Sequence, residues 1–208
     1  IDIMHFYSLE QGRELVSAAR VAIELYIRNP RFDRKLIENR LENFNDRHGI
    51  FVTLESYPSS TLRGCVGYIE GIKEVKHLII EAAIAAAFED PRFPELSLDE
   101  LNKTVVEVSI LSEPKKMPSS AEERLKELEI GRDGLIIQYG SYSGLLLPNV
   151  ATEEHFTKEE FLEAVCDKAG IPSSYWRQQN VNLYRFETQI FKEKMPSGDV
   201  YLAGSQKC

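Results

Sequence analysis

Hydrophobic residues recur along this chain with two periods, and the change from one period to the other predicts where helices and strands lie. A first helix begins at Ser8, where Ser8 and Gln11 match a capping box, and Pro30 ends it. Its apolar residues recur at helical spacing: Leu15, Ala18, Ala19, Ala22 and Tyr26. A second, more polar helix is predicted from Arg34 to Asn45, with inward-facing Leu36, Ile37, Leu41 and Phe44.

After Gly49 the period changes to two, which is typical of strands. Residues 50–57 alternate as a half-buried strand, and residues 66–69 predict a short strand that pairs with it. Lys73–Phe88 is apolar almost all round, so we expect a buried helix whose alanines allow close approach to a sheet. Thr104–Leu111 alternates again and predicts another strand.

The stretch Pro114–Ser120 is rich in proline, lysine and serine and marks the best internal boundary. Beyond it the pattern predicts a helix, a hairpin, a second helix and a long last strand. These are Ala121–Leu128, strands at Leu135–Tyr139 and Gly144–Leu147 with a turn at Gly140–Ser143, helix Lys158–Lys168, and strand Asn182–Phe191.

These elements together predict an α+β fold. The last strand is long enough to return the chain to the first half, which makes the middle segment an insertion. We therefore expect a larger subdomain of residues 1–114 and 181–208, which carries both termini, and a smaller inserted α+β subdomain of residues 115–180.

Composition narrows the classes of function. The formal net charge is −8 and no basic stripe is visible, so we expect no binding to generic nucleic acid. Three cysteines and four histidines at wide spacing form neither a disulfide framework nor a zinc pattern, and no signal peptide or membrane span is recognisable. We predict a cytoplasmic protein with no cofactor, no metal and no membrane partner.

The hexamer Leu62–Gly67 carries the candidate chemistry, because a thiol lies between two glycines where a loop becomes a strand. Gly64 and Gly67 leave backbone uncovered beside Cys65, and Arg63 adds a positive charge that would favour the reactive thiolate. We expect Cys65 to react faster than Cys166 or Cys208. The alternative is a structural cysteine, since free cysteine is among the most buried residue types.

Two further groups of residues are candidates for this chemistry. Asp90 and Arg92 form either a functional pair or, as the pattern favours, a helix-terminating turn tied by a local ion pair. His48 and His155 are the histidines to test as a base for Cys65, although a surface position is the more frequent role.

The hexamer resembles the signature Leu-Arg-Gly-Cys-Ile-Gly of the AMMECR domain family, with Val66 in place of the isoleucine. Other stretches follow in family order: Phe51–Leu54, Asp90–Pro94, Leu146–Ala151, and Lys168–Gly170 with Trp176. Two residues depart from the family pattern, Glu95 where a second proline is frequent and Asn149 where glutamine is frequent.

The resemblance implies an antiparallel sheet flanked by helices in the larger subdomain, and a cleft between the two subdomains that the hexamer faces. The family carries no established biochemical activity. One interpretation is a cysteine-dependent enzyme or enzyme-accessory protein acting on a large substrate, with Cys65 as nucleophile and Arg63 as electrophilic stabiliser. The other is a non-catalytic protein-binding module using the same cleft. The expected binding residues are Leu62, Gly64, Val66, Gly67, Asp90, Arg92, Asn149 and His155. Memo-type and radical-SAM proteins are the partners that the resemblance implies.

Overall fold

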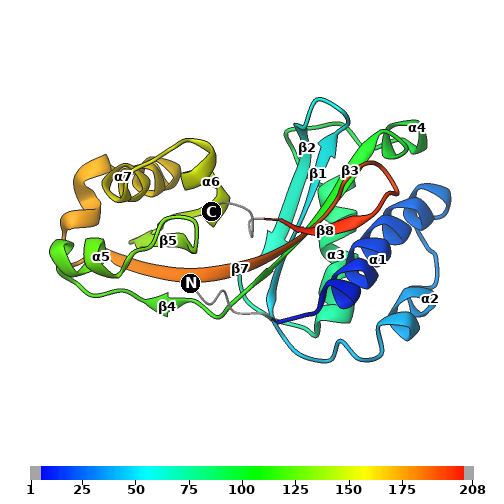
Figure 1. Ribbon diagram of the computed structural model, residues 1–208, viewed down its shortest axis with the longest axis horizontal. Helices are drawn as coiled ribbons and strands as arrows, with labels where there is room; N and C mark the ends of the chain where they lie inside the picture. The colour runs from blue at the N-terminus through cyan, green and yellow to red at the C-terminus, as the bar shows by residue number, and fades with distance from the viewer. Residues whose placement is uncertain (1–5, 204–208) are drawn as a thin grey trace. The chain divides into compact units, whose positions relative to one another are not determined.

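The computed structural model describes residues 6–203 and divides the chain into two compact units. The larger unit comprises the described residues up to Leu111 and from Gln189 onward, and the smaller unit comprises Ser112–Thr188. Strand β7 (Asn182–Glu193) begins in the smaller unit and ends in the larger one (Figure 1). Whether residues 115–180 fold as a separable lobe stays a prediction.

The larger unit is an antiparallel sheet with helices packed on it. Its strands follow the order β2-β1-β3-β7, and β8 pairs with the end of β7. The strands are β1 (Gly49–Ser56), β2 (Thr61–Tyr68), β3 (Thr104–Leu111) and β8 (Val200–Ala203). The helices are α1 (Leu9–Arg28), α2 (Lys35–Glu38), η1 (Asn39–Leu41), α3 (Val75–Phe88) and α4 (Leu98–Leu101).

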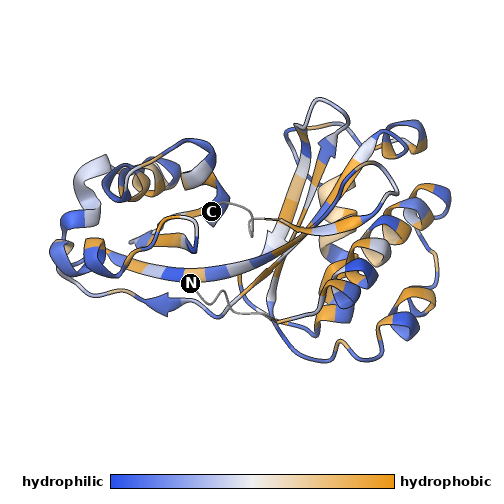
Figure 2. Ribbon diagram, viewed as in Figure 1, coloured by the Kyte–Doolittle hydropathy of each residue, from blue (hydrophilic) through white to orange (hydrophobic). Residues whose placement is uncertain are grey.

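Helices α1 and α3 cover one face of this sheet and form the core with it. The capping box predicted at Ser8 and Gln11 is present, and α1 buries its regularly spaced apolar side. In Figure 2 this helix shows separate hydrophobic and hydrophilic faces. Helix α3 is buried almost all round and packs on β1 and β2. Its alanines permit so close an approach that a Cβ at Gly64 would overlap the backbone oxygen of Ala86.

The helix predicted from Arg34 to Asn45 is wrong in length. Helix α2 ends at Glu38 and tightens into η1, and Leu36, expected to face inward, is 57% exposed. Neighbouring helical residues point about 100° apart, so the burial of Ile37 turns Leu36 toward solvent. Leu41 and Phe44 still reach the core.

The smaller unit has its own antiparallel sheet and its own core. The strand order is β4-β7-β5-β6, with α7 packed on β5 and β6. The strands are β4 (Lys115–Lys116), β5 (Asp133–Tyr139) and β6 (Tyr142–Leu146). The helices are α5 (Ala121–Glu127), α6 (Pro148–Glu153), α7 (Lys158–Ala169) and η2 (Ser173–Arg177). The predicted hairpin is present, but Tyr139 pairs with Tyr142, so the turn is two residues shorter than expected.

A buried arginine holds the smaller unit together. Arg124 on α5 is 1% exposed and donates hydrogen bonds to four backbone carbonyl oxygens. These are the oxygens of Pro118, Trp176, Gln178 and Val181. Burial lowers the pKa of Arg124 from its ordinary value. The guanidinium therefore connects the loop at Pro118 to the backbone between Trp176 and Val181.

Both units combine helices with antiparallel strands, so the predicted α+β class is confirmed.

Candidate functional site

The hexamer Leu62–Gly67 lies on β2, the end strand of the larger unit's sheet. Side chains alternate between the two faces of a strand. Gly64 faces α3, so Cys65 points to the opposite face of the sheet. The sequence could not show that β2 is an edge strand, because that depends on which strands pair.

The Arg63 side chain does not follow the alternation of the other β2 side chains, because Arg63 lies in a β-bulge. Gly64 pairs with Leu54 while Leu62 pairs with Glu55, so Arg63 is the extra residue on β2. A bulge re-aims a side chain. The Arg63 guanidinium donates to Glu100 Oε1 at 3.1 Å and to the Pro94 carbonyl oxygen at 2.9 Å. Arg63 thus ties β2 to the 94–100 segment, and its own Nη1 is buried without a hydrogen-bond partner.

Cys65 begins a row of side chains that crosses the sheet. Cys65 pairs with Thr53 on β1, and Thr53 pairs with Glu107 on β3. The Thr53 hydroxyl donates a hydrogen bond to the Cys65 Sγ at 3.4 Å. Glu107 lies 3.5 Å from the Lys192 ammonium on β7. Directly paired residues share a face, so these side chains form one polar row on the face opposite the helices.

Asp90 binds the outer edge of β2 at Cys65. Its Oδ2 accepts the Cys65 backbone N–H at 2.9 Å, and both its oxygens accept from the Arg92 side chain, at 3.0 and 2.8 Å. The Arg92 backbone N–H donates to Oδ1 at 3.1 Å. The expected ion pair in the turn after α3 is therefore present, and the Arg92 hydrogen bonds hold the Asp90 pKa well below its usual range. We call Thr53, Cys65, Asp90, Arg92 and Glu107 the Cys65 site.

The electrostatics of the Cys65 site favour the neutral thiol. Burial raises the pKa of the Cys65 thiol, and the carboxylates of Glu107 and Asp90 raise it further. The Thr53 hydrogen bond and the Arg92 charge act in the opposite direction but do not reverse the shift. The nearby cation is thus Arg92, whereas the sequence predicted Arg63.

Comparison with known proteins identifies the family to which the chain belongs. The model of the AMMECR1 family matches residues 16–191. The chain belongs to the AMMECR1 family. Protein MJ0810 of Methanocaldococcus jannaschii is 46% identical over 95% of this chain and 97% of its own length. Protein Ta0236 of Thermoplasma acidophilum is 43% identical over 93% and 92%. The crystal structure of the uncharacterized protein PH0010 from Pyrococcus horikoshii superposes with a TM-score of 0.87 at 40% identity, covering 93% of this chain and 96% of that one.

Of the described histidines in the larger unit of this AMMECR1-family chain, neither His48 nor His77 is placed as a base for Cys65. His48 binds Asp46 at 2.8 Å and precedes Thr53 by five residues, roughly 17 Å along an extended strand. His77 binds Glu38 at 3.0 Å. His155 lies in the smaller unit, with a positive φ of 56°, and its proposed role stays a prediction. His5 lies outside the described residues.

The remaining predicted residues fall in different environments. Leu62 is 37% exposed on β2, and Val66 and Gly67 are half-buried. Asn149 lies on α6 in the smaller unit, donates to Glu153 at 3.1 Å, and buries its Oδ1 without a partner. Cys166 is fully buried on α7, as expected, and burial raises its pKa to about 11. Cys208 lies outside the described residues.

Two features of other site classes are absent from the described residues. Among residues 6–203, no group of three or more His, Cys, Asp or Glu side chains is arranged to hold a metal ion. No helix in this described range is both long and apolar enough to cross a membrane. Thr53 and Glu107 are members of the Cys65 site that the sequence did not single out, since only strand register brings them beside Cys65.

Proposed function

We propose that this AMMECR1-family protein is a protein-binding module that receives an extended segment of its partner along the outer edge of β2 at Gly67, next to the Asp90 contact. The observation that carries the proposal is the Cys65 backbone N–H, which donates to the Asp90 side chain instead of to β1. In an antiparallel ladder, the N–H and C=O of one residue both point toward the same neighbouring strand. The residue two positions along the strand directs its N–H and C=O in the same direction. Gly67 therefore directs its N–H and C=O away from β1, where an incoming strand can pair with them.

The surroundings of this edge support recognition. Leu62 and Tyr57 are 37% and 45% exposed near the β1–β2 turn, and the Arg92 side chain is 52% exposed beside Asp90. Tyrosine and arginine are enriched among residues that dominate binding energy at interfaces. An incoming strand would gain backbone hydrogen bonds from β2 and side-chain contacts from these residues.

The chemistry of the thiol also favours binding over catalysis. Within residues 6–203 the Cys65 thiol accepts a hydrogen bond from the Thr53 hydroxyl, and the Glu107 backbone lies two strands away, about 10 Å from that of Cys65. Asp90 is a weak base because its pKa is depressed. A neutral thiol with a raised pKa acts as a small polarisable side chain.

Memo-type and radical-SAM proteins are the partners we propose on the strength of the family resemblance. The test is a binding titration of this protein with a purified Memo-type protein, followed by amide hydrogen exchange of the complex. Binding should slow exchange at Gly67, and Leu62→Arg should weaken binding at least about tenfold, a loss of about 1.4 kcal/mol. Leu36→Arg is the matched control, because Leu36 is an exposed leucine on α2. Binding that leaves the Gly67 amide unprotected would contradict addition of a strand to β2.

The second candidate is a cysteine-dependent enzyme or enzyme-accessory protein that acts on a large substrate with Cys65 as nucleophile. Two observations favour it: Cys65 is half-buried instead of fully buried, and the Arg92 charge opposes the upward shift of the thiol pKa. Cys65→Ser separates the candidates. A binding module keeps its affinity with serine in place of the thiol, whereas a nucleophile-dependent activity is lost.

A further inference from the structure

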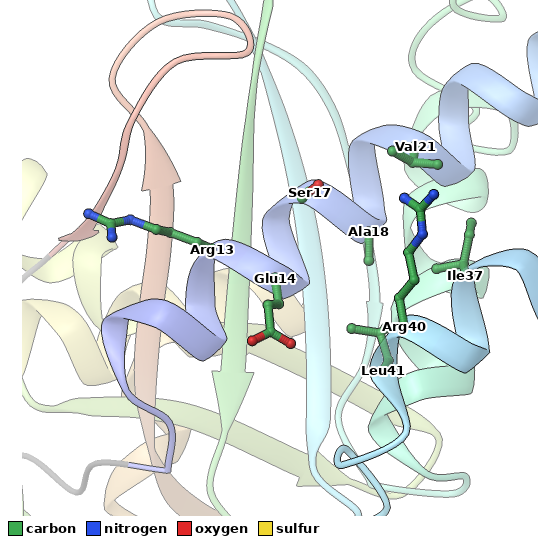
Figure 3. Close-up of a pocket in the computed structure, with 8 residues that line it drawn as sticks. All are labelled: Arg13, Glu14, Ser17, Ala18, Val21, Ile37, Arg40 and Leu41. Atoms are coloured by element: carbon green, nitrogen blue, oxygen red, sulfur yellow. The ribbon is translucent and has the colours of Figure 1, made fainter.

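A pocket of about 280 Å³ lies on the outer side of the larger unit's helices, between α1 and the α2–η1 segment (Figure 3). Its floor is apolar and consists of Ala18, Val21, Ile37 and Leu41. Its remaining lining includes Arg13, Glu14 and Arg40, all of them exposed. This pocket is separate from the Cys65 site, since none of its lining residues belongs to that site.

The two arginines of the pocket have no partner within the described chain. Neither Arg13 nor Arg40 forms an ion pair or a side-chain hydrogen bond with any residue from 6 to 203. Most other guanidiniums of the larger unit are engaged, for example Arg20 with Glu193 and Arg63 with Glu100. These two cations lie beside an apolar floor on a chain whose net charge is −8.

The positions of the two guanidiniums select the kind of ligand. In Figure 3 the Arg40 side chain extends from η1 and ends beside Val21, whereas Arg13 points away from it at the other end of the lined stretch of α1. Arg13 and Val21 are eight residues apart, about 12 Å along a helix. A ligand with a single anionic head and an apolar tail would use only one of these cations.

We propose that the pocket binds an acidic peptide segment of a partner protein that inserts one apolar side chain between two carboxylates. In an extended peptide, alternate side chains share a face, and residues four apart are about 13 Å from each other. The sequence pattern acidic, polar, apolar, polar, acidic therefore spans the length of α1 from Arg13 to Val21, beside which Arg40 ends. The volume of about 280 Å³ lies at the lower end of ligand sites, which measure about 300–1,000 Å³, and has room for one apolar side chain. The negative charge of Glu14, which also lines the pocket, disfavours additional carboxylates between the two acidic residues of the peptide.

The probe is the capped pentapeptide Glu-Ser-Leu-Ser-Glu, titrated into the full chain and followed by amide NMR shifts. The proposal expects shifts confined to residues 13–21 and 37–41. The peptide with serine in place of leucine, and the peptide with glutamine in place of both glutamates, should each bind at least about fivefold more weakly.

Charge reversal in the protein makes the test specific. Arg40→Glu should lower the affinity for the acidic peptide at least about fivefold. A peptide with one lysine in place of a glutamate should bind this variant with the affinity that was lost. Arg31→Glu is the matched control, because Arg31 is an exposed arginine outside the pocket that makes no side-chain ion pair with the described residues. Absence of shifts at millimolar peptide, shifts outside the pocket, or shifts that follow protein concentration without peptide would each overturn the proposal.

Discussion

Replacing the carboxylate that binds the edge of β2 gives the sharpest test of the site's architecture. Asp90 accepts four hydrogen bonds, from the Cys65 and Arg92 backbone N–H groups and twice from the Arg92 guanidinium. Asp90→Asn keeps one of the two oxygens and replaces the other with an amide NH₂ group. This group cannot accept the two hydrogen bonds that the replaced oxygen accepted. Two hydrogen bonds to a charged acceptor are lost at a residue that is 5% exposed.

The magnitude follows from these contacts. A buried hydrogen bond to a charged group contributes about 1.5–3 kcal/mol to stability. Because the Arg92 side chain is exposed to solvent, the hydrogen bond from Arg92 contributes less than the other, and we expect a total loss of about 2–4 kcal/mol. For a protein of this size that corresponds to a fall in Tm of about 5–15 °C. Far-UV circular dichroism is the suitable probe because Trp176, the chain's single tryptophan, reports on the smaller unit.

The pH dependence adds a second criterion. The Asp90 pKa is depressed in the folded state, so its stabilisation is fully present above the unfolded carboxyl pKa of about 3.9 and is lost as pH falls through the lower folded value. The difference between Asp90→Asn and the native protein should therefore shrink below about pH 4. Asp99→Asn is the control, an exposed carboxyl on α4 expected to change stability by less than about 1 kcal/mol. A difference below about 0.5 kcal/mol at pH 7 would refute this account of the edge.

Three further predictions concern the rest of the chain. Arg124→Met leaves four backbone oxygens without their donor and should destabilise the smaller unit by about 3–5 kcal/mol, measured by Trp176 fluorescence during urea unfolding; an unchanged midpoint would contradict it. Limited proteolysis should cut first within 114–120, and first cuts inside α3 would exclude the predicted seam. Generic DNA should not bind, and micromolar binding that weakens steeply with salt would contradict the charge argument.

Local features of the fold could be predicted because their causes lie within a few residues. The capping box at Ser8, the presence of strands β1 and β3, and the ion pair of Asp90 with Arg92 each depend on neighbours in sequence. The length of α2 could not be predicted in the same way, because the burial of Ile37 against the rest of the core decides which residues turn inward.

The candidate site depends on pairing that no local pattern records. Cys65 was recognisable from its two glycines, but the bulge that diverts Arg63 arises only from the register of β1 with β2. Thr53 and Glu107 join the site through the same register. The expected activation of Cys65 assumed a nearby Arg63, and tertiary structure instead supplied burial and two carboxylates.

The pH dependence of Cys65 alkylation distinguishes a binding edge from a nucleophile, because a binding edge needs no thiolate and a nucleophile does. Iodoacetamide labelling of the native protein from pH 6 to pH 10, read by peptide mass spectrometry, resolves Cys65 from Cys166 and Cys208. The account predicts that the Cys65 rate rises with a midpoint above the ordinary cysteine pKa of about 8.5, since burial, Glu107 and Asp90 disfavour its charged form. Rapid Cys65 labelling that persists at pH 6 would contradict it and restore the nucleophile.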